Sequence, residues 1–174
     1  MFIVTNESRN FWINKVSLES SLIESVNQCD VLFLPTDFRN ISNGFFTTST
    51  DFFQFIKKKE NITVDICIND EDYIPISLNS REFRLGTFLI KDIAIPIFVM
   101  IAGEYFLDFL KASPTEDTVS ISIIVEKEDK NYKFDYEGNI ENFLKLEKQF
   151  NLNRDKVKDE KFNNSPKEFQ NKKI

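Results

Sequence analysis

Residues 31–35 of the chain read Val-Leu-Phe-Leu-Pro, and residues 62–68 read Ile-Thr-Val-Asp-Ile-Cys-Ile. The first segment is a continuous apolar run closed by proline, which is typical of a strand buried on both faces of a parallel sheet. The second segment alternates in the way that a half-buried strand does. Between them, Thr50 or Asp51 can cap a helix that ends in the lysines of residues 57–59. The order strand, helix, strand predicts a βαβ unit.

The spacing of apolar residues predicts further elements on either side of this unit. Residues 16–27 carry an apolar face at helical spacing, and residues 2–4 suit a short strand. The apolar stretch over residues 88–110 predicts a helix that Pro96 either interrupts or starts, because proline lacks a backbone donor and disfavours helix at the residue before it. The centre of this stretch has no polar face, so another element must cover it.

Strand-like alternation returns toward the end of the folded part. Residues 119–126 and 132–136 alternate on either side of a polar turn, which predicts an antiparallel hairpin. A helix is then expected over residues 140–150. Together the patterns predict an α/β fold with a short, mainly parallel sheet, a βαβ-like first half, and an antiparallel hairpin plus helix in the second half.

Length and composition predict one domain followed by a tail. The chain has 174 residues, of which 41% are hydrophobic, enough for one well-buried core. Residues 151–174 hold seven Lys or Arg against four Asp or Glu, a net charge of +3, whereas residues 1–150 stand at −9. We expect a single α/β domain over residues 1–150 and a polar, Lys-rich C-terminal tail over residues 151–174. A tail of opposite sign could fold back or reach a partner; a solvated extension is the alternative.

Charge and residue content disfavour several classes of function. A net charge of −6 and a pI near 4.9 leave little room for a basic, nucleic-acid-binding face. The chain contains no histidine, which removes the commonest general base and zinc ligand. None of its four glycines belongs to a phosphate-binding glycine motif. We therefore expect no metal, no cofactor and no nucleic-acid partner.

Cysteine content and hydropathy indicate the compartment. Cys29 and Cys67 lie in or beside apolar runs, so we expect buried and inert thiols. Two such cysteines form no disulfide framework, and the N-terminal residues lack the pattern of a signal peptide, which predicts a cytoplasmic location. The uncharged apolar stretch over residues 93–103 is 11 residues long, whereas a membrane span needs about 20, so no stable membrane insertion is expected.

Polar residues follow both strands of the βαβ unit directly. Asp37 and Arg39 follow the first strand, and Asp70 follows the second. Ligands of open parallel sheets bind beyond the carboxyl ends of the strands. Two carboxylates there could bind a sugar hydroxyl or a hard cation, with Arg39 as an anion contact. The alternative is ordinary turn chemistry, in which short polar residues after strands serve the backbone alone.

Two apolar features indicate a protein partner instead. Five phenylalanines fall within residues 45–55 and cannot all face one small core, so either the sheet covers most of them or some form an exposed aromatic patch. The apolar helix raises the same question. We predict Phe45, Phe46, Phe98 and Met100 as contact candidates for self-association or for a protein partner.

The second half of the chain presents a recognisable order of parts: an apolar helix over residues 93–110, strands over 119–126 and 132–136, Glu137-Gly138, and a short closing helix over 140–144. This order resembles the small accessory, or constant, components encoded beside effector proteins in prokaryotic conflict systems, which act in anti-phage defence. The resemblance covers about residues 88–150 and leaves the first half unmatched. It implies a non-catalytic adaptor that helps an effector assemble or sense a trigger, and it transfers no functional residue.

Two functions of different classes follow from the sequence. The first is a non-catalytic, cytosolic protein-interaction or regulatory module, acting as an accessory component of a defence system. The alternative is a ligand-sensing, nucleotide-sensing or hydrolytic domain, with a pocket at the strand ends beside Asp37 and Asp70.

Overall fold

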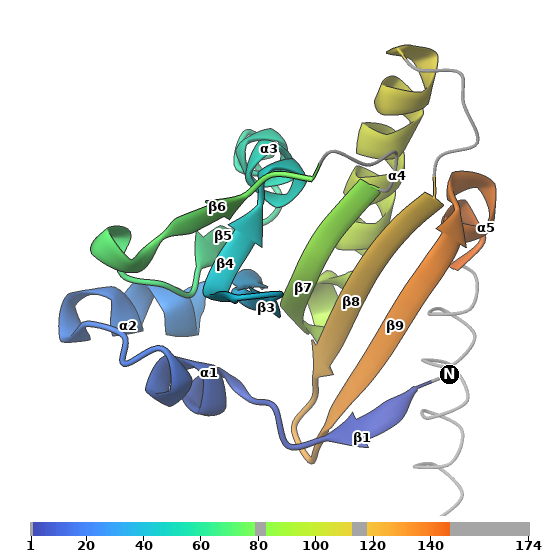
Figure 1. Cartoon of the computed structure of the whole chain (residues 1–174). Helices are drawn as coiled ribbons and strands as arrows, with labels where there is room; N and C mark the ends of the chain where they lie inside the picture. The colour runs from blue at the N-terminus through green and yellow to red at the C-terminus, as the bar shows by residue number, and fades with distance from the viewer. Residues whose placement is uncertain (1, 79–82, 113–117, 147–174) are drawn as a thin grey trace, which may run out of the picture.

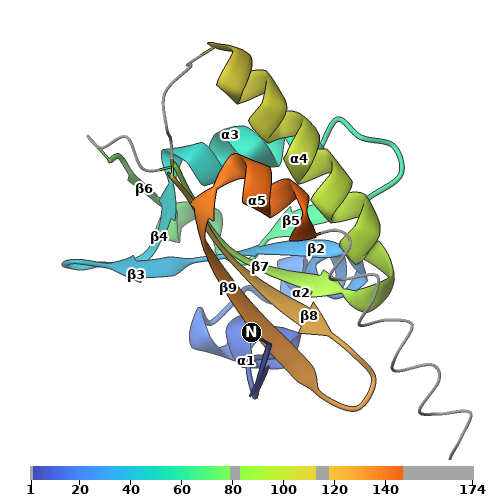
Figure 2. The same cartoon turned by 90° about the vertical axis from the view of Figure 1, so that its right-hand side faces the viewer.

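The computed structural model describes residues 2–78, 83–112 and 118–146, so the predicted C-terminal tail lies outside the described residues. Figures 1 and 2 show a twisted main sheet with α3, α4 and α5 on one face and α1 and α2 on the other. The helices are α1 (Arg9–Lys15), α2 (Ser20–Gln28), α3 (Thr47–Ile56), α4 (Ile95–Ala112) and α5 (Ile140–Leu144), with short 3-10 turns η1 (Asp70–Asp72) and η2 (Asp92–Ala94).

The main sheet has six strands in the spatial order β1-β9-β8-β7-β2-β5. In that order the strands are β1 (Ile3–Thr5), β9 (Asn131–Asn139), β8 (Thr118–Glu126), β7 (Phe83–Lys91), β2 (Val31–Leu34) and β5 (Val64–Ile66). A second, three-stranded sheet contains β3 (Thr36–Phe38), β4 (Ile41–Phe46) and β6 (Ile74–Ile76), in the order β3-β4-β6.

Two parallel strand pairs lie side by side in the main sheet and meet through an antiparallel contact. β2 is parallel to β5, β7 is parallel to β8, and β2 and β7 are antiparallel. In the chain α3 lies between β2 and β5, and α4 lies between β7 and β8, so each pair forms a βαβ unit. Both helices cover the same face of the sheet (Figure 2), as right-handed crossovers require when two units point in opposite directions.

The α/β class and the first βαβ unit are confirmed, but the predicted short, mainly parallel sheet is wrong. The sheet is mixed, because a second βαβ unit runs antiparallel to the first. Residues 88–91, predicted as the start of a helix, form the end of β7; residues 88–90 pair with both β2 and β8, and Lys91 pairs with β8. A strand buried on both faces is continuously apolar, and hydrophobic periodicity cannot distinguish it from a buried helix.

Other predictions hold with shifted boundaries. The helix predicted over residues 16–27 is α2, which begins only at Ser20, because residues 16–19 form a turn in which Ser17 has a φ of 50°. The helix before this turn, α1, was not predicted. Pro96 is the second residue of α4, where its missing N–H has no carbonyl partner to lose, so it starts the helix. The strand at β1 and the antiparallel β8–β9 hairpin are confirmed.

An aromatic cluster joins the two βαβ units under α3 and α4. Phe33 of β2 and Phe88 of β7 are direct register partners, and their rings pack edge to face with centroids 4.6 Å apart. Phe52 of α3 lies 5.9 Å from Phe88, and Phe98 of α4 lies 5.3 Å from the same ring. All four side chains are buried, so one cluster holds both helices on the sheet.

The start of α3 is fixed to an irregularity in β7. The register of β7 against β8 shifts between Arg84 and Gly86, and Gly86 has a φ of 86°. The hydroxyl of Thr48 donates to the carbonyl of Arg84, and the hydroxyl of Ser49 donates to the carbonyl of Leu85. The bulge thus supplies two acceptors that orient α3 on the sheet.

Gly86→Ala is expected to lower the free energy of unfolding by more than about 1 kcal/mol, because an L residue is strained at this φ and a Cβ would lie 3.0 Å from the Ser49 hydroxyl. Urea unfolding monitored by circular dichroism measures the loss. Gly138→Ala is the control, since its Cβ would meet mainly the movable end of Tyr136. Equal losses in the two variants would contradict the role assigned to the bulge.

Candidate functional site

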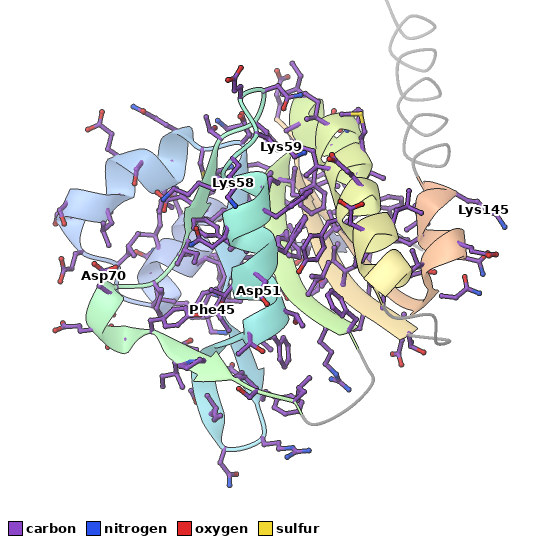
Figure 3. The ribbon with its side chains drawn as sticks, turned by 90° about the horizontal axis from the view of Figure 1, so that it is seen from above. Phe45, Asp51, Lys58, Lys59, Asp70 and Lys145 are labelled. Atoms are coloured by element: carbon purple, nitrogen blue, oxygen red, sulfur yellow. The ribbon has the colours of Figure 1, made fainter. Side chains whose placement is uncertain are left out.

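The predicted ligand residues at the strand ends lie in two separate small elements. β2 continues through Pro35 into β3, so Asp37 and Arg39 belong to the β3–β4 hairpin. Asp70 is an exposed residue of η1, which follows β5. In Figure 3 Asp70 lies at the edge of the molecule, on the side of α3 away from α4.

The carboxylate of Asp37 serves the backbone of its own hairpin. Its Oδ1 accepts a hydrogen bond of 3.0 Å from the N–H of Asn43, a residue with a φ of 56°. Its Oδ2 lies 3.4 Å from Nζ of Lys15 on α1. The hydrogen bond from Asn43 lowers the pKa of Asp37 below its ordinary value, and the Lys15 ammonium adds to the shift. These contacts give Asp37 a structural role in the hairpin, as expected of a short polar residue that serves the backbone after a strand.

Arg39 is occupied by an aromatic contact. Its guanidinium carbon lies 5.1 Å from the ring centre of Phe38, and that of Arg84 lies 5.5 Å from the same ring. Cation–π contacts of this kind stabilise the tip of the hairpin by about 0.5–1 kcal/mol each at exposed sites. Two guanidinium groups, one from the hairpin and one from β7, thus lie near the ring of Phe38.

Next to Asp70, the buried residue Asn69 does the structural work at the end of β5. Its Oδ1 accepts a 2.8 Å hydrogen bond from the N–H of Glu19, and its Nδ2 donates to Asp72 at 2.9 Å. Asn69 thereby links the end of β5 to the start of α2. The sequence alone does not predict this link, because an asparagine after a strand gives the same signal as an ordinary turn.

Metal-ligand clusters and reactive thiolates are two common kinds of chemical site. Among the described residues, no group of three or more His, Cys, Asp or Glu is placed to hold a metal ion. Cys29 and Cys67 are buried free thiols, as predicted. Burial raises the pKa of Cys29, and raises that of Cys67 to about 12, so both stay protonated near neutral pH and are poor nucleophiles.

The predicted contact residues separate into three buried side chains and one exposed side chain. Phe45, Phe46 and Phe98 expose only 3%, 5% and 0% of their surface, so these three predicted contact residues lie in the core of the described fold. Phe45 stacks on Tyr73 with ring centres 5.4 Å apart. Phe45 and Phe46 belong to β4, which pairs with β6 in the second sheet. Met100 is 55% exposed and remains available.

Met100 is the centre of an exposed apolar stripe along α4. Ile93, in η2 two residues before the start of α4, is 71% exposed, and Leu107 is 45% exposed. Met100 and Leu107 are seven positions apart within α4, so they differ by only about 20° around the helix and lie on one side of it. Ile93 is seven positions before Met100 in the sequence. We call Ile93, Met100 and Leu107 the α4 face. The spacing of seven was the sequence signal for Ile93 and Leu107, but it was masked because apolar residues occur on every side of this helix.

Charged groups border the α4 face. Glu104, four residues after Met100, is bound by Nζ of Lys59 at 2.8 Å. Lys59 follows α3, and Figure 3 shows it at the end of that helix beside α4. Asp92 lies 3.8 Å from Nζ of Lys127, and Asp108 is exposed. An apolar stripe with acidic residues on its borders is the result.

No protein-family model, no curated protein and no solved structure matches the chain. The α4 face therefore has to be interpreted from its own geometry.

Although α4 is strongly apolar, no helix within the described part of the chain has the combination of length and hydropathy needed to cross a membrane.

Asp37→Asn is expected to lower the free energy of unfolding near pH 7 by no more than about 1 kcal/mol, because the carboxylate is largely exposed and its charge is screened. The pKa of Asp37 in the folded chain lies below its unfolded value of about 3.9. Its stabilisation is therefore present above that value and is lost as the pH falls through the folded pKa.

Urea unfolding near pH 7 and again near pH 2 measures this difference. Asp70→Asn makes the same change of charge in η1 and serves as the control. The structural role of Asp37 is refuted if its substitution and the control have equal effects, or if the difference persists in acid.

Proposed function

We propose that the chain is a non-catalytic protein-interaction module whose contact surface is the α4 face. The observation that carries this proposal is the exposure of Ile93, Met100 and Leu107 along a helix whose opposite side is fully packed. Phe98, Ala102 and Phe106 on that opposite side expose none of their surface. Monomeric proteins bury most contiguous apolar surface of this kind, and patches left exposed commonly mark interaction sites.

A second copy of the chain suits the α4 face. Ile93 and Leu107 are each seven residues from Met100, so the stripe reads the same from either end. An isologous contact about a two-fold axis needs this self-complementarity. Two antiparallel α4 helices centred on Met100 would place Ile93 of one copy near Leu107 of the other. The charge of Glu104 beside this contact is offset by Lys59.

An adaptor role in a defence system is part of the same proposal. Its support is the order of α4, β8, β9 and α5, which is the order of parts on which the resemblance to accessory components rests. An adaptor of that class needs a contact surface and no catalytic residue.

The ligand-binding alternative has weaker support from the geometry. Asp37 is bound by Asn43 and Lys15, and Arg39 stacks on Phe38. These contacts account for the two side chains without a ligand. We therefore place the function at α4 and not at the strand ends.

Met100→Lys is expected to abolish self-association while leaving the thermal midpoint close to that of the natural chain. The substitution puts two like charges at the centre of the contact, and exposed substitutions usually change stability by no more than about 0.5 kcal/mol. Light scattering over a range of concentrations measures the mass, which should rise above 20.4 kDa for the natural chain and not for Met100→Lys.

Two further variants make this test specific. Met100→Leu keeps an apolar side chain and should still associate. Phe98→Ala removes a buried ring and should lower the free energy of unfolding by about 3–5 kcal/mol. A mass that stays at one copy for the natural chain and every variant would refute self-association through α4.

A further inference from the structure

We propose that the outer edge of β9 over residues 135–139 binds an extended segment of another protein, in which basic and apolar residues alternate. The bound segment adds a strand to the main sheet, on the same edge as β1. This surface is separate from the α4 face, so the inference goes beyond the proposed function and does not depend on self-association.

β1 covers only part of the outer edge of β9. It pairs with residues 131–133, and Phe2 packs on Phe134 with ring centres 5.1 Å apart. Within the described residues no strand pairs with residues 135–139 on the outer side, and Figure 1 shows β1 beside the lower end of β9 alone. An edge of this kind presents unpaired backbone N–H and C=O groups, to which an extended segment of another chain can bind.

The two faces of this edge differ in chemistry. Tyr136 lies on the face that α5 covers, because its ring packs on Phe143 with ring centres 5.6 Å apart. Its side chain also lies over Gly138, where a Cβ would be 2.9 Å from the Tyr136 hydroxyl oxygen. Asp135 and Glu137 belong to the opposite face, because successive residues of a strand alternate, and both are exposed. A segment added here meets an aromatic ring on one face and two carboxylates on the other.

The two carboxylates suit a basic partner. The hydroxyl of Ser122 donates a 2.6 Å hydrogen bond to Oδ1 of Asp135, which leaves the charge of that carboxylate in place. Neither Asp135 nor Glu137 belongs to an ion pair with any described residue. Lys133, two residues before Asp135, is paired with Glu7 at 3.0 Å. Opposite charges at facing positions of neighbouring strands attract, so Lys or Arg at alternate positions of the segment would pair with the two carboxylates.

The same charges disfavour a second copy of the chain at this edge. An antiparallel contact between two β9 strands, centred on Tyr136, would place Asp135 of one copy opposite Glu137 of the other. Like charges at directly opposed positions destabilise a sheet. The edge therefore selects a segment of a different chain, whose charges are opposite to its own.

A labelled peptide tests the backbone pairing. The probe is the dye-labelled, end-capped peptide Lys-Val-Lys-Val-Lys, and fluorescence anisotropy measures its binding to the full chain. Two isomers carry N-methyl groups either on both Val residues or on two of the Lys residues. Because the N–H groups of alternate residues point to opposite edges of a strand, one isomer should bind like the parent peptide and the other at least about tenfold more weakly. Equal affinities of the two isomers, or no binding of the parent peptide, overturn the proposal.

Charge reversal tests the choice of partner. Asp135→Lys with Glu137→Lys should weaken binding of the Lys peptide at least about tenfold, and should bind the peptide in which Glu replaces Lys. Asp70→Lys with Glu71→Lys makes the same change of charge in η1, which follows the strand at the other edge of the sheet, and should leave binding unchanged. Equal effects of the two double variants overturn the assignment to β9. Met100→Lys should bind the peptide as the natural chain does, so failure of self-association through α4 and failure of this inference give different results.

Discussion

The antiparallel contact between β2 and β7 is the constraint on which the rest of the structure depends. Phe33 and Phe88 face each other across it, and they pack on the helices of both βαβ units. Two parallel strands and one helix leave two strand edges and one face of the sheet open, and a unit of this size buries too small a fraction of its surface to be stable by itself. Joined at β2 and β7, the two units share one face for α3 and α4 and one aromatic core.

This shared core explains why α4 is apolar on all sides. The sheet covers its inner side, while α3 and α5 flank it, through Tyr105 against Phe52 and through Phe106 against Phe143. Only the outward stripe of Ile93, Met100 and Leu107 has no cover from the described residues. The proposed function concerns this stripe, because its three apolar side chains are exposed.

The strand-end site shows the limit of motif reasoning. Asp37, Arg39 and Asp70 stand where ligand residues of α/β proteins stand, yet the chain after β2 turns at once into a hairpin. Asp37 then caps the backbone of that hairpin and Arg39 stacks on its neighbour. The residue types were correctly located after the strands, but the partners of Asp37 come from α1 and β4, whose positions no local pattern reveals.

The sequence by itself determined the elements whose patterns are local: β2, β5, the β8–β9 hairpin and the helical character of residues 95–112. Period and punctuation within a few residues are enough for these, because they follow from backbone geometry and the burial of one face. Only the tertiary structure decided that residues 83–91 are a strand, that the sheet is mixed, and that Phe45, Phe46 and Phe98 are buried while Met100 is exposed. Burial depends on which elements pack together, and a uniformly apolar segment carries no sign of which of its sides will be covered.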